Sequence, residues 1–248
     1  MFFDIQKASM MKRISALLLD IILLAIAATG FCFLVSVAVG YDAKYDELEA
    51  YYDKYESDYG ISLHVTGAEL DSLPSEEVEK YLKATSAMNA DEGLNRLYTK
   101  VVNLTLVIQS LGILFGYLVT EFAVPMIFGN GQTVGKKVFG LCLMQKDQTK
   151  LKPLALAVRT VLGKYAVETM IPVFMFVMLL GNMTGIGATI VVGLLLVIQL
   201  AVLIRTPTNS AIHDIFADTV VVDIKSQKIF DDIKAKEEYK IRMEKGNL

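Results

Sequence analysis

The sequence predicts an all-α membrane protein with four transmembrane helices, an extracytoplasmic helical insertion and short cytoplasmic strands. Hydrophobic residues make up 54% of the 248-residue chain, and the mean hydropathy is +0.46. These residues are gathered in blocks, and about 20 apolar residues suffice to cross a hydrocarbon core. The net charge is only -3, but acidic and basic residues occupy different loops. We therefore expect contact with the lipid bilayer and no binding of nucleic acid.

The first apolar run covers residues 14–39 and begins directly after Arg13. It is longer than the apolar core of a signal peptide and has no clear small-residue cleavage site, so we interpret it as a retained anchor. Asp20 lies inside the run, where an ionised carboxylate costs about 2.5 to 3.5 kcal/mol at mid-helix. Residues 1–40 are thus expected to form a cytoplasmic N-terminus and the first transmembrane helix.

Residues 41–100 form an insertion with fourteen acidic and six basic residues, a net charge of -8. One stripe of residues recurs at spacings of four and three, namely Tyr41, Tyr45, Leu48, Tyr52, Tyr55 and Tyr59, which predicts a helix that continues the first span outward. Thr66-Gly-Ala-Glu69 resembles a capping box, Pro74-Ser75 opens a second helical stretch through about Met88, and Asp91-Glu92 opens a third. The aromatic stripe is expected to pack helix against helix, or alternatively to bind a ligand or a protein partner.

Three later apolar segments complete the predicted bundle within residues 101–224. Residues 101–128 contain one acid, Glu121, and residues 185–204 carry no charge, so both are long enough to span. Residues 166–180 form a shorter segment with Glu168 near its start and Pro172 inside it. The turn at residues 181–185 would join the last two segments as an antiparallel hairpin or as a re-entrant pair.

The loop between the second and third predicted spans is strongly basic. Short loops rich in lysine and arginine remain on the cytoplasmic side of a membrane. Against the single acid Asp147, this loop carries Lys136, Lys137, Lys146, Lys150, Lys152, Arg159 and Lys164. We therefore predict a multi-pass protein of the cell membrane with both termini in the cytoplasm and the acidic insertion outside. Residues 225–248 are expected to form a charged cytoplasmic tail, helical over 231–245.

The sequence contains no complete pattern of catalytic or cofactor-binding residues. Cys32 and Cys142 match neither a disulfide framework nor metal-ligand spacing. His213-Asp214 lacks a nucleophile pattern and a second histidine at ligand spacing, so we expect no catalytic residue, no metal and no enzyme activity. No cofactor is expected either.

A glycine-rich stretch of the basic loop departs from the spacing of a phosphate-binding loop, because Lys137 rather than serine or threonine follows Lys136. We interpret it as a tight turn that anchors basic side chains at anionic headgroups. The residues of this loop motif are Gly131, Thr133, Gly135 and Lys136.

Three segments together carry a family resemblance. They are Arg13-Ile-Ser-Ala-Leu-Leu-Leu-Asp20, Gly131-Gln-Thr-Val-Gly-Lys-Lys with Gly140, and Asn209-Ser-Ala-Ile-His-Asp-Ile-Phe-Ala-Asp-Thr-Val-Val-Val222. In order and predicted topology the chain resembles the RDD family of small membrane proteins. The resemblance implies that Arg13, Asp20 and Asp214 are the residues for which the family is named. It also implies a poorly defined role, with sodium/proton exchange suggested for some members.

The chain departs from the family pattern at two turns. Asp147-Gln148 stands where an Asp-Gly turn is usual, and Asp218 stands where a glycine often lies. These departures affect the local turns and leave the expected fold intact. The segment after the second turn, residues 219–224, is predicted to be a short strand that pairs with residues 140–145.

The predicted depths of the acidic side chains suggest a shared site. Asp20 and Glu121 each lie seven residues from the inner end of their helix, about 10 Å below the inner surface. With Arg13 and Asp214 they would form either a buried polar network that fixes the helices or an ion-binding site in an inward cavity. Asp214 is expected to cap a short helix or to pair with Arg159, Arg205 or Lys136.

Two functional hypotheses follow from these residues. The first is transport, or exchange of a cation for protons, through the carboxylate cluster of the inner leaflet. The alternative is a noncatalytic accessory or assembly protein of the membrane that binds a protein partner through its external insertion. Four spans make a thin bundle for a solute pathway, so a homo-oligomer is compatible with the transport hypothesis.

Overall fold

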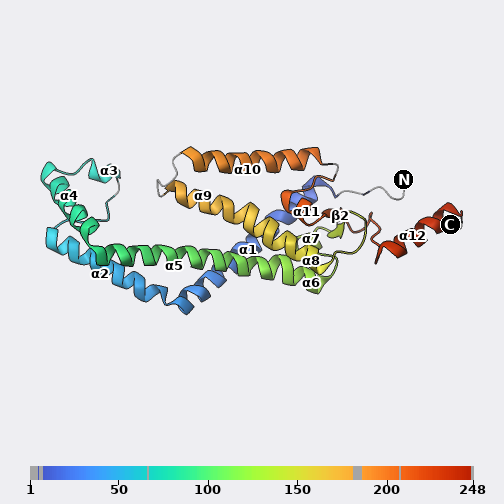
Figure 1. Cartoon of the computed structure of the whole chain (residues 1–248), viewed down its shortest axis with the longest axis horizontal. Coiled ribbons are helices and arrows are strands. Elements are labelled where there is room, and N and C mark those ends of the chain that lie inside the picture. Colours follow the sequence, from blue (N-terminus) through green and yellow to red (C-terminus); the bar gives the residue numbers. More distant parts are fainter. Residues whose placement is uncertain (1–4, 6–7, 66, 181–185, 207, 247–248) are drawn as a thin grey trace. The chain divides into compact units, whose positions relative to one another are not determined.

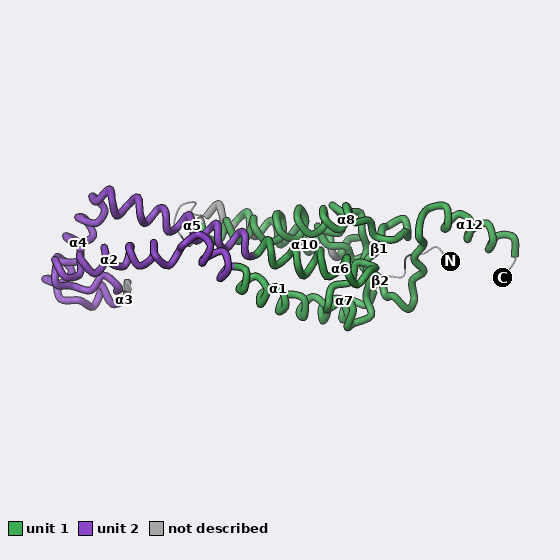
Figure 2. The backbone as a smooth tube through the Cα atoms, turned by 90° about the horizontal axis from the view of Figure 1, so that it is seen from below, with its two compact units in different colours: residues 1–31, 113–248 green, residues 32–112 purple. Residues whose placement is uncertain are grey.

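The computed structural model describes residues 5, 8–65, 67–180, 186–206 and 208–246 (Figure 1). The chain is predominantly helical, and two compact units can be distinguished in it (Figure 2). Unit 1 comprises residues 1–31 and 113–248, and unit 2 comprises residues 32–112. Three helical stretches among the described residues are long and apolar enough to cross a membrane, namely Met10–Val39, Glu92–Phe128 and Pro153–Val177.

The first of these stretches is α1 (Met10–Val39), which contains Asp20 in its first half. Gly40 follows in the left-handed conformation, with φ of 64°, and α2 (Tyr41–Tyr59) begins directly after it. The helix expected to continue the first span is therefore present as α2, but a left-handed residue at Gly40 ends the hydrogen-bond ladder of α1 and separates the two helices. Glycine adopts this conformation without the steric cost that a side chain would add.

Unit 2 contains the acidic insertion and has its own hydrophobic cluster. Besides α2 it includes α3 (Gly67–Leu70), α4 (Ser75–Ala90) and the first part of α5 (Glu92–Tyr117). The buried residues of this hydrophobic cluster are Leu48, Met88, Leu94, Leu97 and Val101. Tyr51, Tyr52 and Tyr55 of α2 pack against this cluster, so the aromatic stripe covers a helical core, as the first of the two interpretations expected. The proposed cap residue Thr66 lies outside the described residues.

The second candidate span continues α5 through η1 (Leu118–Ala123), a π-helical turn, into α6 (Val124–Phe128). A π-helical turn widens the helix locally and is frequent at functional sites. Glu121 lies within η1 and is 4% exposed. The π-helical turn therefore widens the helix at the residue whose acidic side chain is directed into the protein.

The third candidate span begins earlier than the sequence predicted. It comprises α8 (Pro153–Ala157), η2 (Val158–Met170), a long π-helical stretch, and α9 (Ile171–Leu180). Arg159 and Lys164, expected in the basic loop, instead lie in η2 and are buried. A hydropathy-based prediction leaves charged residues out of a span, because hydropathy does not depend on whether a charge is paired with another side chain. The turn at 181–185 lies outside the described residues, and α10 (Ile186–Arg205) follows it.

Short elements lie at one end of unit 1, beside the charged ends of the candidate spans (Figure 1). They are α7 (Val134–Val138), β1 (Leu141–Gln145), α11 (Ile212–Phe216) and β2 (Thr219–Asp223). β1 and β2 pair antiparallel, with Leu141 opposite Asp223 and Gln145 opposite Thr219. These are the residues for which the sequence analysis expected a strand pair. The tail contains α12 (Ile233–Glu244), close to the predicted helix over 231–245.

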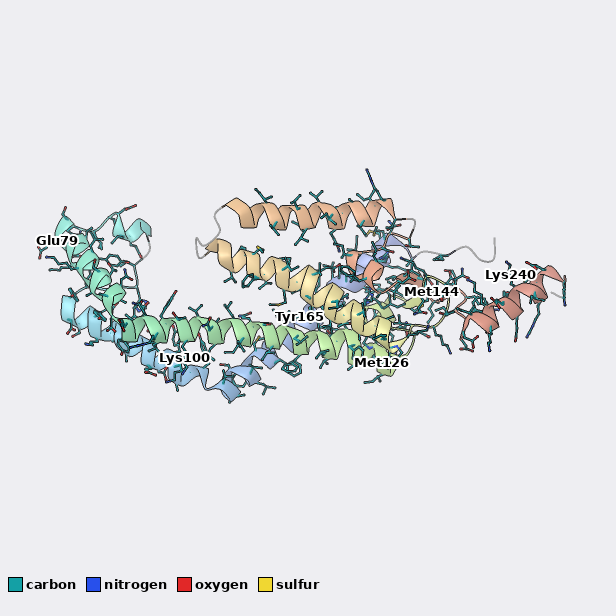
Figure 3. All side chains as sticks on the ribbon, viewed as in Figure 1. Glu79, Lys100, Met126, Met144, Tyr165 and Lys240 are labelled. Atoms are coloured by element: carbon teal, nitrogen blue, oxygen red, sulfur yellow. The ribbon has the colours of Figure 1, made fainter. Side chains whose placement is uncertain are left out.

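Both faces of this strand pair are covered. Leu141, Leu143 and Val221 belong to a cluster that includes Ala16 of α1 and Leu156 of α8. On the other face, Cys142, Met144, Val220 and Val222 form a second cluster, and Met144 is labelled in Figure 3. A two-stranded sheet alone is only marginally stable, so burial on both faces explains why it persists. The sheet anchors the loops that carry the charged residues described next.

Candidate functional site

A cavity of about 230 Å³ lies within unit 1, beside most of its buried charges. Its walls come from α1, α7, β1, η2, α10, α11 and β2. The titratable side chains among its described lining residues are Arg13, Asp20, Lys136, Arg159, Lys164, Glu168 and His213. Charged groups buried within a membrane protein are costly unless they are paired, so their partners decide what the site can do.

Asp20 of α1 connects the first candidate span to the loop motif. Its Oδ2 accepts a hydrogen bond from Thr133 Oγ1 at 2.5 Å, and its Oδ1 accepts one from Gly135 N at 2.8 Å. Lys136 Nζ lies 3.9 Å from Asp20 Oδ2 and donates to Thr133 Oγ1 at 3.1 Å. Asp20 therefore holds the N-terminal end of α7 against α1.

The loop motif needs its glycines for this close approach. A Cβ added to Gly135 would collide with the carbonyl oxygen of Ala16 and would lie 2.8 Å from Asp20 Oδ1. Gly131 has φ of +62°, and a Cβ there would lie 2.7 Å from Leu143 Cβ. The expected tight turn is present, but Lys136 is 7% exposed and faces carboxylates. Its predicted role at lipid headgroups is wrong for that reason.

Glu121 is held between two lysines. It forms an ion pair with Lys164 through Oε1, and its Oε2 lies 3.8 Å from Lys136 Nζ. The backbone carbonyl of Glu121 also accepts a hydrogen bond from Thr160 Oγ1 at 3.0 Å. These contacts join the second and third candidate spans to α7, and Lys136 links Glu121 with Asp20.

Asp214 of α11 is fully buried and has several donors. Its Oδ1 accepts hydrogen bonds from Arg159 Nη2 at 2.8 Å and from Arg159 Nε at 3.2 Å. Its Oδ2 accepts one from Ala211 N at 3.0 Å, which caps α11, and lies 3.7 Å from Arg13 Nη2. Of the roles and partners considered from the sequence, the structure shows both the helix cap and the pair with Arg159.

A second acidic group, Glu168 of η2, contacts the histidine that precedes Asp214. His213 Nδ1 and Glu168 Oε2 are 2.7 Å apart, and His213 N donates to Glu168 Oε1 at 3.0 Å. Gln199 of α10 donates to the same Oε1 at 3.3 Å. Gly163 permits this arrangement, because a Cβ there would lie 2.5 Å from His213 Cβ. The Glu168 side chain is 20% exposed, the most of the four carboxylates in this region.

The short elements outside the candidate spans contain groups with shifted pKa values. Burial lowers the pKa of Lys136 to about 8, although Glu121 opposes the shift. Burial alone would raise the pKa of Asp214, but neighbouring positive charge, chiefly that of Arg159, and the hydrogen bonds from Ala211 N and Arg159 together outweigh it and hold that pKa below its usual range. The pKa of His213 is lowered by burial and by the charge of Arg159. Burial therefore favours the neutral form of His213.

The four residues expected to cluster lie in two groups of ion pairs, and among the described contacts the only direct one between any two of them is the longer Arg13 to Asp214 contact. Asp20 and Glu121 are linked through Lys136, while Arg13 and Asp214 meet beside Arg159. The sequence analysis did not assign Lys164 or Gly163 to the site. Their signal was weak, because a lysine after a basic loop and a lone glycine occur in many contexts. We name the side chains Arg13, Asp20, Glu121, Lys136, Arg159, Lys164, Glu168, His213 and Asp214 the ionic cluster.

The ionic cluster contains four cationic residues and four carboxylates, so it is neutral overall when His213 is neutral. Within the described part of the chain, no group of three or more His, Cys, Asp or Glu side chains is arranged to hold a metal ion. The ionic cluster therefore places fixed charges beside the cavity and contains one histidine–carboxylate pair that can exchange a proton.

Comparison with known proteins identifies the family. The model of the RDD family matches residues 7–218, which is most of the chain, and the chain therefore belongs to this family. The resemblance inferred from the three motifs is confirmed. No curated protein and no solved structure matches the chain.

Proposed function

We propose that this RDD family protein is a four-span transport protein of the cell membrane that moves a small charged solute through the cavity beside the ionic cluster. One observation carries the proposal: a cavity of about 230 Å³ is lined by seven titratable side chains within a unit built of apolar helices. Intramembrane ionisable residues that face a cavity mark solute or proton pathways in many membrane proteins.

A purely architectural network explains the pairing of the carboxylates but does not require the cavity. Buried ion pairs can often be replaced by apolar residues of similar volume at no loss of stability, because desolvation offsets much of their attraction. A network kept only to hold helices together would also be expected to fill its interior at the packing density of a protein core. A cavity lined by these charged side chains favours a solute site over architecture alone.

The membrane arrangement in this proposal has both termini in the cytoplasm and α10 as the fourth span. Support comes from the charge distribution, since Lys137, Lys146, Lys150 and Lys152 lie between the second and third candidate spans. Single-cysteine variants provide the test. A membrane-impermeant maleimide should label Asp58→Cys in intact cells, and Lys234→Cys only after permeabilisation. Labelling of Asp58→Cys only after permeabilisation would show that the topology is the reverse of the one proposed.

The structure favours Glu168 with His213 as the proton-exchanging pair over Asp20 and Glu121. Asp20 accepts two hydrogen bonds from the loop motif, and Glu121 is held by two lysines, so both carboxylates have structural partners. Glu168 is more exposed and contacts a histidine at 2.7 Å. Proton exchange requires a group whose charge changes near neutral pH, and a histidine–carboxylate pair supplies one.

Reconstituted vesicles test this function directly. A pH-sensitive dye inside the vesicles reports proton movement when a gradient of sodium chloride or of sodium benzenesulfonate is imposed. We expect a gradient-dependent pH change that Glu168→Gln abolishes, while Glu92→Gln, which alters an exposed acid of unit 2, leaves it unchanged. Equal pH changes for the wild type, Glu168→Gln and protein-free vesicles would refute transport.

A second candidate function rests on unit 2. Because its hydrophobic cluster is its own, the acidic insertion has the character of an independent module that can present a surface to a partner. We infer that an accessory or assembly role would reside there. Deleting residues 43–95 should then remove partner co-purification while vesicle transport is retained. Loss of transport with unchanged co-purification would contradict the accessory role.

A further inference from the structure

The wall of the cavity is more positive than the ionic cluster as a whole. Four cations line it, namely Arg13, Lys136, Arg159 and Lys164, but only two carboxylates, Asp20 and Glu168. Glu121 and Asp214, which balance the remaining charge, are not among the described lining residues. A ligand in the cavity thus meets more positive than negative side chains. This arrangement attracts an anion and disfavours a metal cation.

The hydrogen bonds of Arg159 provide a second, independent observation. The residue is 1% exposed, and its Nε and Nη2 both donate to Asp214 Oδ1. Its Nη1, by contrast, is buried without a hydrogen-bond partner among the described residues. Buried polar groups are almost always hydrogen-bonded, and a guanidinium donor without an acceptor is costly. Arg159 lines the cavity, so an anion held there would lie beside this guanidinium.

The other part of the wall is apolar. Met10, Ile14, Leu17 and Val221 line the cavity together with the charged residues. Ligand sites commonly combine such apolar walls with a few polar groups that fix orientation. At about 230 Å³ the cavity is below the roughly 300 to 1,000 Å³ of pockets for drug-sized ligands, so its ligand is small.

We propose that the cavity binds a small organic anion, whose charged head lies among Arg13, Arg159 and Lys164 and whose apolar body lies against Ile14 and Leu17. The proposal rests on the proposed transport function and names the class of its solute. It differs from the cation exchange suggested by the sequence, because the carboxylates of the ionic cluster already have cationic partners.

Charge balance couples this anion to a proton. The ionic cluster is neutral when His213 is neutral, so one bound anion leaves it with one negative charge. A proton taken up by the pair of His213 and Glu168 restores neutrality. His213 faces Glu168, Arg159 and Lys164 of η2 and Asp214 of its own helix, and the two positive neighbours resist protonation until an anion offsets them. The solute and the proton therefore bind together.

Isothermal titration of the purified full-length protein in detergent tests the proposal. The probe is benzenesulfonate, whose charge does not change with pH, so any pH dependence belongs to the protein. We expect at least about 10-fold tighter binding at pH 6 than at pH 8, since uptake of one proton per anion gives up to about tenfold per pH unit and therefore up to about 100-fold over this range. Glu168→Gln removes one negative charge and should bind the anion more tightly at pH 8 than the wild type does.

A cavity-filling variant separates this site from general anion adsorption. Leu17→Trp should reduce benzenesulfonate affinity at least 10-fold, because Leu17 lines the cavity, while its neighbour Leu18→Trp should not. Leu18 is 58% exposed and is not among the described lining residues, so it controls for the added indole. Equal binding by both tryptophan variants, or weaker binding by Glu168→Gln, would overturn the proposal.

The headgroup of an anionic lipid also carries a negative charge beside an apolar body, so it is the alternative ligand that must be distinguished. In nanodiscs of phosphatidylcholine, benzenesulfonate should bind as in detergent, and nanodiscs rich in phosphatidylglycerol should give the same affinity. Loss of binding in phosphatidylglycerol would assign the cavity to a lipid and overturn the solute proposal. Anion binding without any vesicle flux would reject transport alone, whereas sodium-driven flux without anion binding would reject this inference alone.

Discussion

Replacing Asp214 with asparagine removes one charge from the most deeply buried ion pair of the protein. Asp214 is fully buried and Arg159 is 1% exposed, so the substitution leaves a guanidinium without its counter-charge. Breaking a buried pair from one side typically costs about 3 to 5 kcal/mol. Asparagine also carries two N–H donors where Asp214 accepts from Ala211 N, which adds about 1 kcal/mol for the lost helix cap. Arg13, 3.7 Å away, retains only a weaker partner.

We therefore expect Asp214→Asn to lower the free energy of unfolding by about 4 to 6 kcal/mol. The assay is reversible unfolding by sodium dodecyl sulfate in mixed micelles, followed by far-ultraviolet circular dichroism. Asp218→Asn is the matched control, four residues further along the chain. The Asp218 side chain is 73% exposed and lies 3.1 Å from Lys146 Nζ, and an exposed pair of this kind contributes at most about 1 kcal/mol.

A double-mutant cycle separates the pair from general damage. Arg159→Met with Asp214→Asn removes both charges, so no unpaired charge remains buried and the combined loss should be smaller than the sum of the single losses. We expect a coupling energy of about 2 kcal/mol or more. Additive losses, or an Asp214→Asn variant within 1 kcal/mol of the wild type, would refute the inference that this pair holds α11 against η2.

Two further predictions concern pH and close packing. Burial lowers the pKa of His213 in the folded protein below its unfolded value of about 6.5. Below about pH 6.5 the unfolded chain therefore binds a proton at this histidine more readily than the folded chain does. Stability should fall as the pH decreases through this range. His213→Asn should reduce the loss of stability between pH 7.5 and pH 5.5, whereas the exposed His64→Asn should not; equal losses in both would contradict the assignment. Gly135→Ala should destabilise the protein by about 1 to 3 kcal/mol because the methyl group meets the Ala16 carbonyl. Gly30→Ala, which adds a methyl group where no other atom lies within 4 Å, should be neutral or stabilising in the same unfolding assay.

The two departures from the family pattern acquire a physical meaning in the structure. Gln148 has φ of 71° and Asp218 has φ of 52°, so both stand in the left-handed region that favours glycine. The resemblance to the family implies glycine at these two turns, and the left-handed backbone found here fits that expectation. Residues with side chains at these positions accept a local strain, which aspartate tolerates better than most residues do.

Much of the architecture was readable from the sequence because it depends on local patterns. The apolar run after Arg13, the helix opened by Pro74-Ser75 and the helical tail follow from hydropathy, capping chemistry and periodicity over neighbouring residues. The shared neighbourhood of Asp20 and Glu121 was also foreseen, because depth along a helix follows from its rise per residue. These features require no knowledge of which distant segments touch.

Only the tertiary structure decided which charges pair and what space remains between them. Arg159 and Asp214 are 55 residues apart, and Lys136 reaches both Asp20 and Glu121 through a loop whose path no local pattern specifies. Hydropathy placed Arg159 and Lys164 outside the third span, since a charge is costly in an apolar helix until a partner on another helix offsets it. The sequence by itself thus determined the helices and their charged residues, while the fold determined the ion pairs and the cavity, because both arise from contacts between segments far apart in the chain.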